Sequence, residues 1–346
     1  MMYAGYIAPR TPTQPLQAKE KKALREVIYG VDIIRYLEEH LGYRLFPWQV
    51  AVLSDRSRRI SVDGARQGGK STITSAKVAH KAKYKAGSLS VILAPTLIQS
   101  QETMRKVKDF IALDPTYPDL VRSASDTVEL SNGSRILVLP ATERTARGFS
   151  RPDIILFDEA SRIEDEVYDA VRPMINNSPR SEIIEISTPY GKKGFFYRHF
   201  CDPDRARYLV RSPYEPRITM DRPVLDRITP EDALQSIRSD LPESAAPERI
   251  HIFFSPQHES EKDQAEAMGD LMVNGYRQEM GCSFVESDDA AFSLSLIDDM
   301  FGASADTWAL DKEEGMEKDM DYGEQDEEFR MEYEAMKDEM EASGWR

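Results

Sequence analysis

Residues 64–72 carry the pattern of a phosphate-binding loop. They read Gly-Ala-Arg-Gln-Gly-Gly-Lys-Ser-Thr, which matches the motif G-x-x-x-x-G-K-[ST] at every required position. Glycines let successive backbone N–H groups turn toward phosphate oxygens at the start of a following helix. We therefore predict that Lys70 reaches the β- and γ-phosphates of a nucleotide and that the Ser71 hydroxyl binds Mg²⁺. The residues of the loop predicted to bind the nucleotide are Gly64, Gln67, Gly68, Gly69, Lys70, Ser71 and Thr72.

Two adjacent carboxylates follow an apolar run 87 residues further along the chain. Ile154-Ile155-Leu156-Phe157 is followed by Asp158 and Glu159. A parallel sheet would deliver this strand end beside the phosphates, where Asp158 positions Mg²⁺ and Glu159 polarises the water that attacks the γ-phosphate. The simpler alternative is a buried strand followed by a capping aspartate. Together with the loop, the pattern favours ATP hydrolysis that requires Mg²⁺.

Strands that alternate with helices must position these residues. Such alternation favours an α/β fold of the P-loop NTPase (ASCE/RecA-like) class, with a mainly parallel central sheet buried between helices. Asp126 to Leu139 also reads as a hairpin that turns at Asn132-Gly133. The expected strands are 59–63, 90–94, 153–157 and 182–187, and the expected helices of this region are 26–41, 71–86 and 98–111.

Beyond residue 217 the strand pattern weakens, and helices are expected over 228–237 and 264–279. From Asp311 onward the chain is rich in Glu, Asp and Met and poor in apolar anchors, which is typical of disorder or of a loose charged helix. We predict four parts: a mobile N-terminal arm (1–26), a P-loop ATPase core (27–216), a small helical lid or linker (217–292) and an acidic tail (293–346).

Composition sets limits on the class of protein. In a chain of 346 residues that is 40% hydrophobic and 30% charged, no stretch of about 18 apolar residues predicts a transmembrane helix. The two cysteines, Cys201 and Cys282, form neither a disulfide framework nor a zinc pattern. The net charge is −15, but residues 311–346 carry −10 of it, and basic clusters lie around residues 19–25, 77–85 and 105–108. Composition therefore permits a DNA partner without indicating one.

Two weaker signals flank the loop and the carboxylates. The strand 183–187 ends in Ser187-Thr188-Pro189, and hydroxyls at such a strand end can sense the γ-phosphate, although an ordinary turn gives the same pattern. Upstream, Trp48-Gln49 could contact a nucleotide base, because the glutamine amide offers both a donor and an acceptor. For Trp48 the pattern favours a core position over a stacking surface.

These blocks together resemble the ATPase domain of the large terminase subunit of tailed double-stranded DNA bacteriophages, over about residues 43–292. The residues that carry the resemblance are Phe46-Pro47-Trp48-Gln49, Ala65-Arg66-Gln67-Gly68-Gly69-Lys70-Ser71, Arg147-Gly148, Ile155-Leu156-Phe157-Asp158-Glu159-Ala160, Ser187-Thr188-Pro189 with Gly191, and Tyr276-Arg277-Gln278-Glu279. The pair Arg66-Gln67 inside the loop is the most diagnostic of them.

The resemblance implies an ATP-hydrolysing motor that translocates viral DNA into a procapsid. It implies catalytic roles for Arg66, for Arg147 offered across a subunit interface, for Lys70 and for Glu159, and a coupling role for Ser187, Thr188 and Pro189. Each arginine could instead be an ordinary surface residue. The implied partners are double-stranded DNA bound without regard to sequence, the portal protein, the small terminase subunit and further copies in a ring, in the host cytoplasm and transiently at the portal vertex.

The chain departs from the resemblance at its C-terminus. The family pattern predicts a nuclease domain there, but only about 55 residues follow Phe292, too few for a scaffold that holds two metal ions. We therefore do not predict nuclease activity in this chain, and a separate nuclease subunit is a possible partner. Two other functions stay open: a helicase-like ATPase acting on DNA or RNA, and a nucleotide-binding assembly subunit without turnover. Lys192-Lys193 is a candidate DNA contact, and an exposed loop is its simpler explanation.

Overall fold

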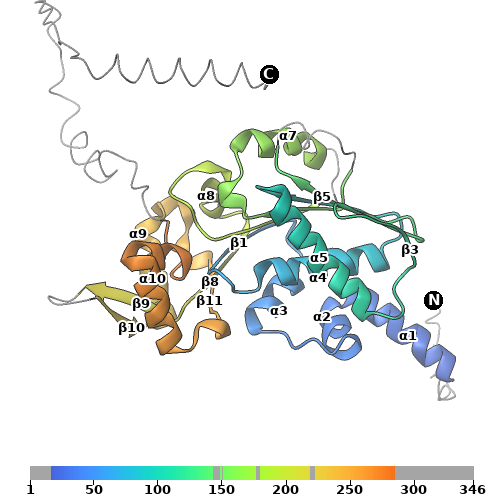
Figure 1. The fold of residues 1–346 in the computed structure, drawn as a ribbon, viewed down its shortest axis with the longest axis horizontal. Helices are drawn as coiled ribbons and strands as arrows, with labels where there is room; N and C mark the ends of the chain where they lie inside the picture. The colour runs from blue at the N-terminus through green and yellow to red at the C-terminus, as the bar shows by residue number, and fades with distance from the viewer. Residues whose placement is uncertain (1–16, 143–148, 150, 177–179, 219–222, 285–346) are drawn as a thin grey trace, which may run out of the picture. The chain divides into compact units, whose positions relative to one another are not determined.

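A nine-stranded sheet runs through the described part of the chain, with its strands in the order β11-β8-β1-β7-β6-β2-β5-β4-β3 (Figure 1). The computed structural model describes residues 17–142, 149, 151–176, 180–218 and 223–284. The strands of the sheet are β1 (Arg59–Gly64), β2 (Leu89–Ala94), β3 (Leu120–Ser123), β4 (Thr127–Leu130), β5 (Arg135–Pro140), β6 (Ile154–Asp158), β7 (Glu182–Ser187), β8 (Ala206–Arg211) and β11 (His251–Phe254).

Pairing within the sheet is parallel from β11 across to β5 and antiparallel only at the β5-β4-β3 edge. A separate two-stranded hairpin consists of β9 (Tyr214–Ile218) and β10 (Pro223–Arg227). The α/β class with a mainly parallel sheet is thus confirmed, and the predicted hairpin at Asn132-Gly133 is the β4–β5 connection.

Helices precede the sheet, connect its strands and follow its last described strand. The longer ones are α1 (Ala18–Val31), α3 (Pro47–Ser54), α4 (Lys70–Tyr84), α5 (Leu97–Leu113), α7 (Asp165–Asn176), α8 (Gly194–Phe200), α9 (Pro230–Asp240) and α10 (Glu261–Glu279). The short ones are α2 (Ile33–Arg35), a π-helical turn over Tyr36–His40, and 3₁₀ turns over Ala160–Arg162, Glu243–Ala245, Pro247–Arg249 and Pro256–His258. Among the helices described, none is long and apolar enough to span a bilayer.

The two faces of the sheet bury two separate apolar clusters. Along β6, Ile154 and Leu156 belong to the cluster under α3, α4 and α5, whereas Ile155 and Phe157 belong to the cluster under α7 and α8. Successive side chains of a strand point to opposite faces, so a strand covered on both sides must be apolar throughout. Figure 1 shows α7 and α8 on one side of the strands and α4 and α5 on the other.

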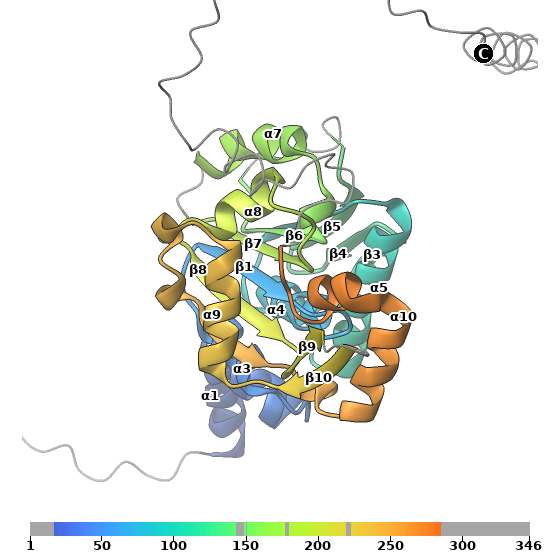
Figure 2. The same ribbon diagram turned by 90° about the vertical axis from the view of Figure 1, so that its left-hand side faces the viewer.

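The structure corrects several boundaries and adds strands that the sequence did not indicate. Helix α1 begins at Ala18, inside the stretch assigned to an N-terminal arm, and the predicted helix 26–41 is broken at Asp32. The region past residue 217 is not wholly helical. Strand β9 ends just inside it at Ile218, and β10 and β11 lie within it. Figure 2 views the end of the core where α9, α10 and this hairpin lie.

Strand β11 escaped detection because its sequence His251-Ile252-Phe253-Phe254 is too short for periodicity to separate strand from helix. It pairs in parallel with β8, so it extends the sheet by one strand beyond the predicted core. The division into core and lid at residue 217 stays a prediction.

Strands β1, β6 and β7 are neighbours in the sheet and run in the same direction. In register, Asp63 pairs with Ser187 and Asp158 with Ile186. Their carboxyl ends therefore meet at one edge, which is the usual place for a ligand site in a parallel sheet. This geometry brings the phosphate-loop residues, the paired carboxylates and the Ser187 segment together.

Candidate active site

The loop between β1 and α4 has the backbone that a phosphate-binding loop requires. Gly69 caps α4 with φ of +85°, and Gln67 has φ of +59°. A Cβ at Gly64 would lie 2.6 Å from Lys70 Cδ, and one at Gly68 would lie 3.0 Å from the carbonyl oxygen of Ala65. A side chain at Gly64 would displace the Lys70 side chain, and one at Gly68 would crowd the Ala65 carbonyl. The glycines of the motif are therefore explained by the packing of the loop on itself.

The Lys70 ammonium group lies inside the loop. Lys70 is buried, and its Nζ donates to the carbonyl oxygens of Gly64 at 2.5 Å and of Ala65 at 2.9 Å. Both bonds are local and can be exchanged for phosphate oxygens by rotating the side chain. The predicted role of Lys70 is compatible with this geometry and stays a prediction.

Asp158 is held between two hydroxyl groups. Ser71 Oγ donates to its Oδ1 at 3.0 Å, and Thr103 Oγ1 donates to its Oδ2 at 2.7 Å. The structure thus brings together the two residues predicted to hold Mg²⁺. A hydroxyl and a carboxylate are hard oxygen ligands, which suit Mg²⁺ when nucleotide phosphates and water complete its shell.

Sequence reasoning missed Thr103. It lies two turns into α5, is 2% exposed, and approaches Asp158 only because α5 packs beside the β6 end. A threonine inside a polar helix carries no motif, and no signal in the sequence relates it to a carboxylate 55 residues away. The helix that follows β2 was predicted, but not which of its residues faces the site.

Glu159 stands directly after β6 in a left-handed backbone conformation with φ of +55°. Such a conformation is uncommon for a residue with a side chain and is frequent at functional sites. Burial raises the pKa of the Glu159 carboxyl, the Lys70 charge opposes this rise, and the Asp158 charge adds to it. A carboxyl group of raised pKa within the influence of the Lys70 and Asp158 charges suits the role of a general base.

The Ser187 segment contacts Glu159. The Ser187 hydroxyl lies 3.5 Å from Glu159 Oε2 and 2.7 Å from the Ser161 hydroxyl. Ser161 in turn donates from its hydroxyl to the carbonyl oxygen of Thr188 at 2.7 Å, and its N–H donates to Ser187 Oγ at 3.1 Å. Pro189 follows directly. Ser161, which sequence reasoning did not select, therefore joins the carboxylate strand to the predicted coupling segment.

Trp48 and Gln49 pack against the loop from α3. Gln49 Nε2 would lie 3.4 Å from a Cβ at Gly69, and Trp48 Cζ2 would lie 4.0 Å from it. The side-chain oxygen of Gln49, Oε1, accepts a hydrogen bond from the Phe46 N–H at 3.0 Å. Because Trp48 is only 1% exposed, its ring is a core element in this conformation rather than an open stacking surface. A contact of either residue with a base stays a prediction.

The structure places one of the two candidate arginines. Arg66 is exposed on the loop, and its backbone N–H donates to the carbonyl oxygen of Glu279 at 2.8 Å. This bond ties the loop to the end of α10, within the Tyr276–Glu279 block of the resemblance. Arg147 and Gly148 lie outside the described residues. Thr72 is half-buried in the first turn of α4.

A segment with no recognisable motif covers the loop. After β11, the Gln257 side-chain amide lies within hydrogen-bond distance of the carbonyl oxygens of Gln67 (2.6 Å) and Gly68 (3.2 Å). His258 is buried beside Arg66, and burial lowers the pKa of its ring. This segment therefore packs against the backbone of the loop at Gln67 and Gly68. No sequence pattern predicts this contact, because it depends on the position of β11.

The fold and this edge of the sheet define a P-loop ATPase domain. Residues 62–212 match the family described as terminase large subunit, T4likevirus-type, N-terminal. The match covers fewer than half of the residues of the chain and agrees with the resemblance found in the sequence. The match spans the loop, the paired carboxylates and the Ser187 segment.

A solved terminase ATPase domain agrees with this chain in fold. The large terminase ATPase domain of Thermus phage P74-26 superposes with a TM-score of 0.51 at 19% identity, covering 72% of this chain and 97% of that one. A point mutant of the same phage domain gives a TM-score of 0.50 with the same identity and coverage. The large terminase of bacteriophage HK97 is 17% identical, with a TM-score of 0.48, and the match covers 68% of this chain but 50% of that one.

Proposed function

We propose that this chain hydrolyses ATP and uses the energy to translocate double-stranded viral DNA into a procapsid. The observation that carries the proposal is the meeting of Ser71, Asp158 and Glu159 at one sheet edge, beside a loop with phosphate-binding geometry. The terminase family match over the same residues supports it.

Each residue has a distinct part in the proposed hydrolysis. Loop N–H groups and Lys70 bind the phosphates, while Ser71 and Asp158 hold Mg²⁺, which when bound neutralises charge on the phosphate oxygens. Glu159 accepts a proton from the attacking water. Arg66, or Arg147 from a neighbouring copy, supplies positive charge to the transferring phosphoryl group, an effect typically worth about 10³ to 10⁵ in rate.

The contacts of Ser187 suggest how hydrolysis is reported to the rest of the domain. Glu159, Ser187, Ser161 and Thr188 form a continuous path of polar contacts of 2.7 to 3.5 Å. A change in the hydrogen bonds of Glu159 on loss of the γ-phosphate would shift the Ser187 hydroxyl and with it the Thr188-Pro189 backbone. The proposed coupling role of this segment rests on that path.

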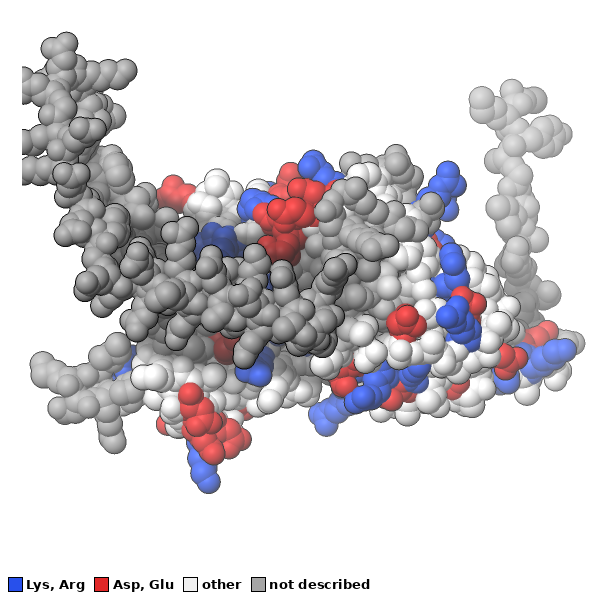
Figure 3. Space-filling model, turned by 45° about the horizontal axis from the view of Figure 1, so that its top comes forward, with Lys and Arg blue, Asp and Glu red and all other residues white. Residues whose placement is uncertain are grey.

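Partners follow from the proposed task. A motor that moves a whole genome must hold DNA by its phosphate backbone, since base contacts would favour particular sequences. On the face shown in Figure 3, Lys and Arg side chains lie beside Asp and Glu side chains rather than in a continuous basic stripe. We place DNA binding in local contacts, Lys192 and Lys193 among the candidates. The portal protein, the small terminase subunit and a ring of copies are further proposed partners, in the host cytoplasm.

The proposal is tested by phosphate release from ATP over a range of protein concentrations, with and without duplex DNA and portal protein. We expect weak turnover of the dilute chain and a rise at concentrations that permit assembly, because Arg147 would then complete a neighbouring site. Nucleotide binding without turnover under every condition would contradict the proposal. Strand displacement on a forked duplex would indicate a helicase instead.

A further inference from the structure

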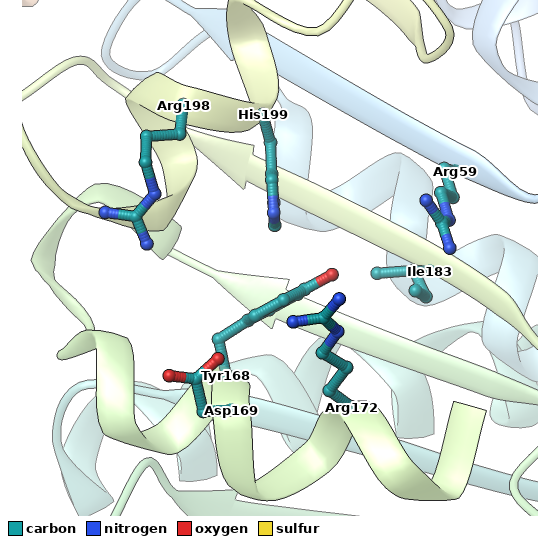
Figure 4. A pocket seen from close by; sticks show the side chains of 7 residues that line it. All are labelled: Arg59, Tyr168, Asp169, Arg172, Ile183, Arg198 and His199. Carbon is teal, nitrogen blue, oxygen red and sulfur yellow. The ribbon is translucent and has the colours of Figure 1, made fainter. Parts of the chain in front are cut away.

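A polar cavity lies at the opposite ends of the strands that carry the active site. It has a volume of about 250 Å³ and lies between the starts of β1 and β7 and the helices α7 and α8 (Figure 4). Arg59 begins β1 and pairs in register with Ile183 of β7, and both residues line the cavity. The phosphate loop and Ser187 lie at the other ends of these same strands.

The cavity is strongly basic for a chain with a net charge of −15. Three arginines from three elements line it, Arg59 of β1, Arg172 of α7 and Arg198 of α8, and Asp169 is the single acid among the described residues of its wall. Arg198 donates to Asp165 at 2.8 Å. Arg59 and Arg172 form no ion pair within the described parts of the chain. As far as those parts extend, two guanidinium groups therefore remain available to a ligand.

Contacts of His199 with the sheet and with Tyr168 hold the inner wall of the cavity in place. The ring of His199 reaches toward Tyr168 in Figure 4, and the two rings meet edge-on with centroids 4.5 Å apart. His199 Nδ1 lies 2.9 Å from Glu185 Oε1, inside the sheet, so the other ring nitrogen, Nε2, is the one turned away from that bond. The Arg172 side chain extends from α7 toward the Tyr168 ring in Figure 4, and both residues line the cavity.

The size and lining of the cavity select the kind of ligand. Pockets for drug-sized organic molecules usually measure about 300 to 1,000 Å³ and have mainly apolar walls. This cavity is smaller, and only Tyr168 and Ile183 among its described lining residues give it an apolar wall. Guanidinium groups bind the oxygens of phosphate in bidentate fashion and are the preferred partners of that group. A phosphate group with its hydration water fits both properties.

We propose that this cavity is a phosphate-binding site whose main ligand is a backbone phosphate of duplex DNA. The choice of DNA as the source of the phosphate rests on the proposed packaging function. The site adds a DNA contact at the edge of the sheet away from the nucleotide. Because β1 and β7 run without interruption from Arg59 and Ile183 to Gly64 and Ser187, the contact is rigidly connected to the loop and to the coupling segment.

The test compares two double variants that remove the same charge. R59Q/R172Q removes two arginines that line the cavity, and R44Q/R122Q removes two exposed arginines elsewhere on the same domain. Fluorescence anisotropy with a labelled DNA duplex gives the DNA affinity of each over a series of salt concentrations. Thermal unfolding with inorganic phosphate added tests whether a free anion binds the cavity.

We expect R59Q/R172Q to bind DNA more weakly than the parent chain. The negative slope of log K against log salt should become shallower by about 1, the change typical of one lost phosphate contact. The R44Q/R122Q slope should equal that of the parent chain. A third result is that inorganic phosphate stabilises the parent chain but not R59Q/R172Q, while the salt slopes of DNA binding are equal in the two proteins. This result would support the phosphate site, assign it to a free anion and exclude DNA as its ligand.

Two results would overturn the inference. One is that both double variants bind DNA and phosphate alike. The other is that R59Q/R172Q changes only the self-association of the chain, which would assign the cavity to a subunit contact. Failure of the proposed function would show differently, in a parent chain that binds no DNA or hydrolyses no ATP.

Discussion

Two buried carboxyl groups in neighbouring strands of the sheet are held in opposite ways. In the middle of β7, Glu185 is fully buried and accepts hydrogen bonds from Arg205 at 2.6 Å, Ser61 at 3.0 Å and His199 at 2.9 Å. Burial favours a raised pKa of the Glu185 carboxyl, but these partners hold it below its ordinary value. Near the carboxyl end, burial raises the pKa of Asp63 well above its ordinary value, against the charges of Lys70 and Arg211.

The difference distinguishes a buried carboxylate that stabilises the fold from a buried carboxyl group beside the proposed nucleotide site. The Glu185 carboxylate has a cation and two further hydrogen-bond partners within the fold, which is usual for buried charge. At the loop, the Lys70 ammonium group donates to nearby backbone carbonyl oxygens. The buried Asp63 carboxyl group has no hydrogen-bond partner among the described residues. Poorly satisfied buried groups concentrate at functional sites, where a ligand supplies the missing interactions. The predictions below test this contrast.

The largest effect on stability is expected at Glu185. Arg205→Met leaves the Glu185 carboxylate buried without its cation, and breaking such a pair from one side typically costs about 3 to 5 kcal/mol in the free energy of unfolding. Urea unfolding followed by circular dichroism measures the change. The matched control is Arg217→Met, because Arg217 forms an exposed ion pair with Asp226 that is worth at most about 1 kcal/mol. Equal losses of unfolding free energy in the two variants would contradict the stabilising role assigned to the buried Arg205–Glu185 pair.

A smaller and more selective effect is expected from Thr103. Thr103→Val keeps the shape of the side chain but removes the hydroxyl that donates to Asp158, and loss of such a supporting bond typically costs about 10- to 100-fold in metal affinity or activity. We expect ATP turnover to fall by about tenfold and the Mg²⁺ concentration for half-maximal rate to rise.

Thr103→Ser should restore most of both values, since it restores the hydroxyl. Ser100→Ala on the same helix is the control, because its hydroxyl donates to the Thr96 carbonyl rather than to Asp158. A Thr103→Val variant with lower turnover but an unchanged Mg²⁺ requirement would show that Thr103 acts on stability rather than on Asp158.

The smallest effect is expected at Asp63. Its pKa is higher in the folded than in the unfolded chain, so the folded state holds the proton more tightly. Stability from this group therefore falls as pH rises above the ordinary aspartate range, until the folded carboxyl also ionises. Asp63→Asn should flatten that part of the pH profile of the unfolding free energy. A variant profile as steep as that of the parent would contradict the assignment.

The sequence predicted the parts of the site that a motif or a strand end defines. The loop follows β1 and opens α4 as expected, and Ser71 meets Asp158 because parallel strands end at a common edge. Thr103, Ser161 and Gln257 could not be predicted in this way. Each reaches the site through packing of an element whose orientation no local pattern encodes, and Gln257 also depends on β11, a strand too short to detect.

The most direct test of the central claim is ATP hydrolysis by the Glu159→Gln variant. The substitution keeps the shape of the side chain and removes its basicity, and a positioned general base typically contributes about 10² to 10⁴ in rate. We expect phosphate release to fall by at least about 10²-fold while fluorescent ATP-analogue binding stays within a few fold of the parent. Hydrolysis by Glu159→Gln at the parental rate would contradict the account, because the carboxylate after β6 would then not activate the attacking water.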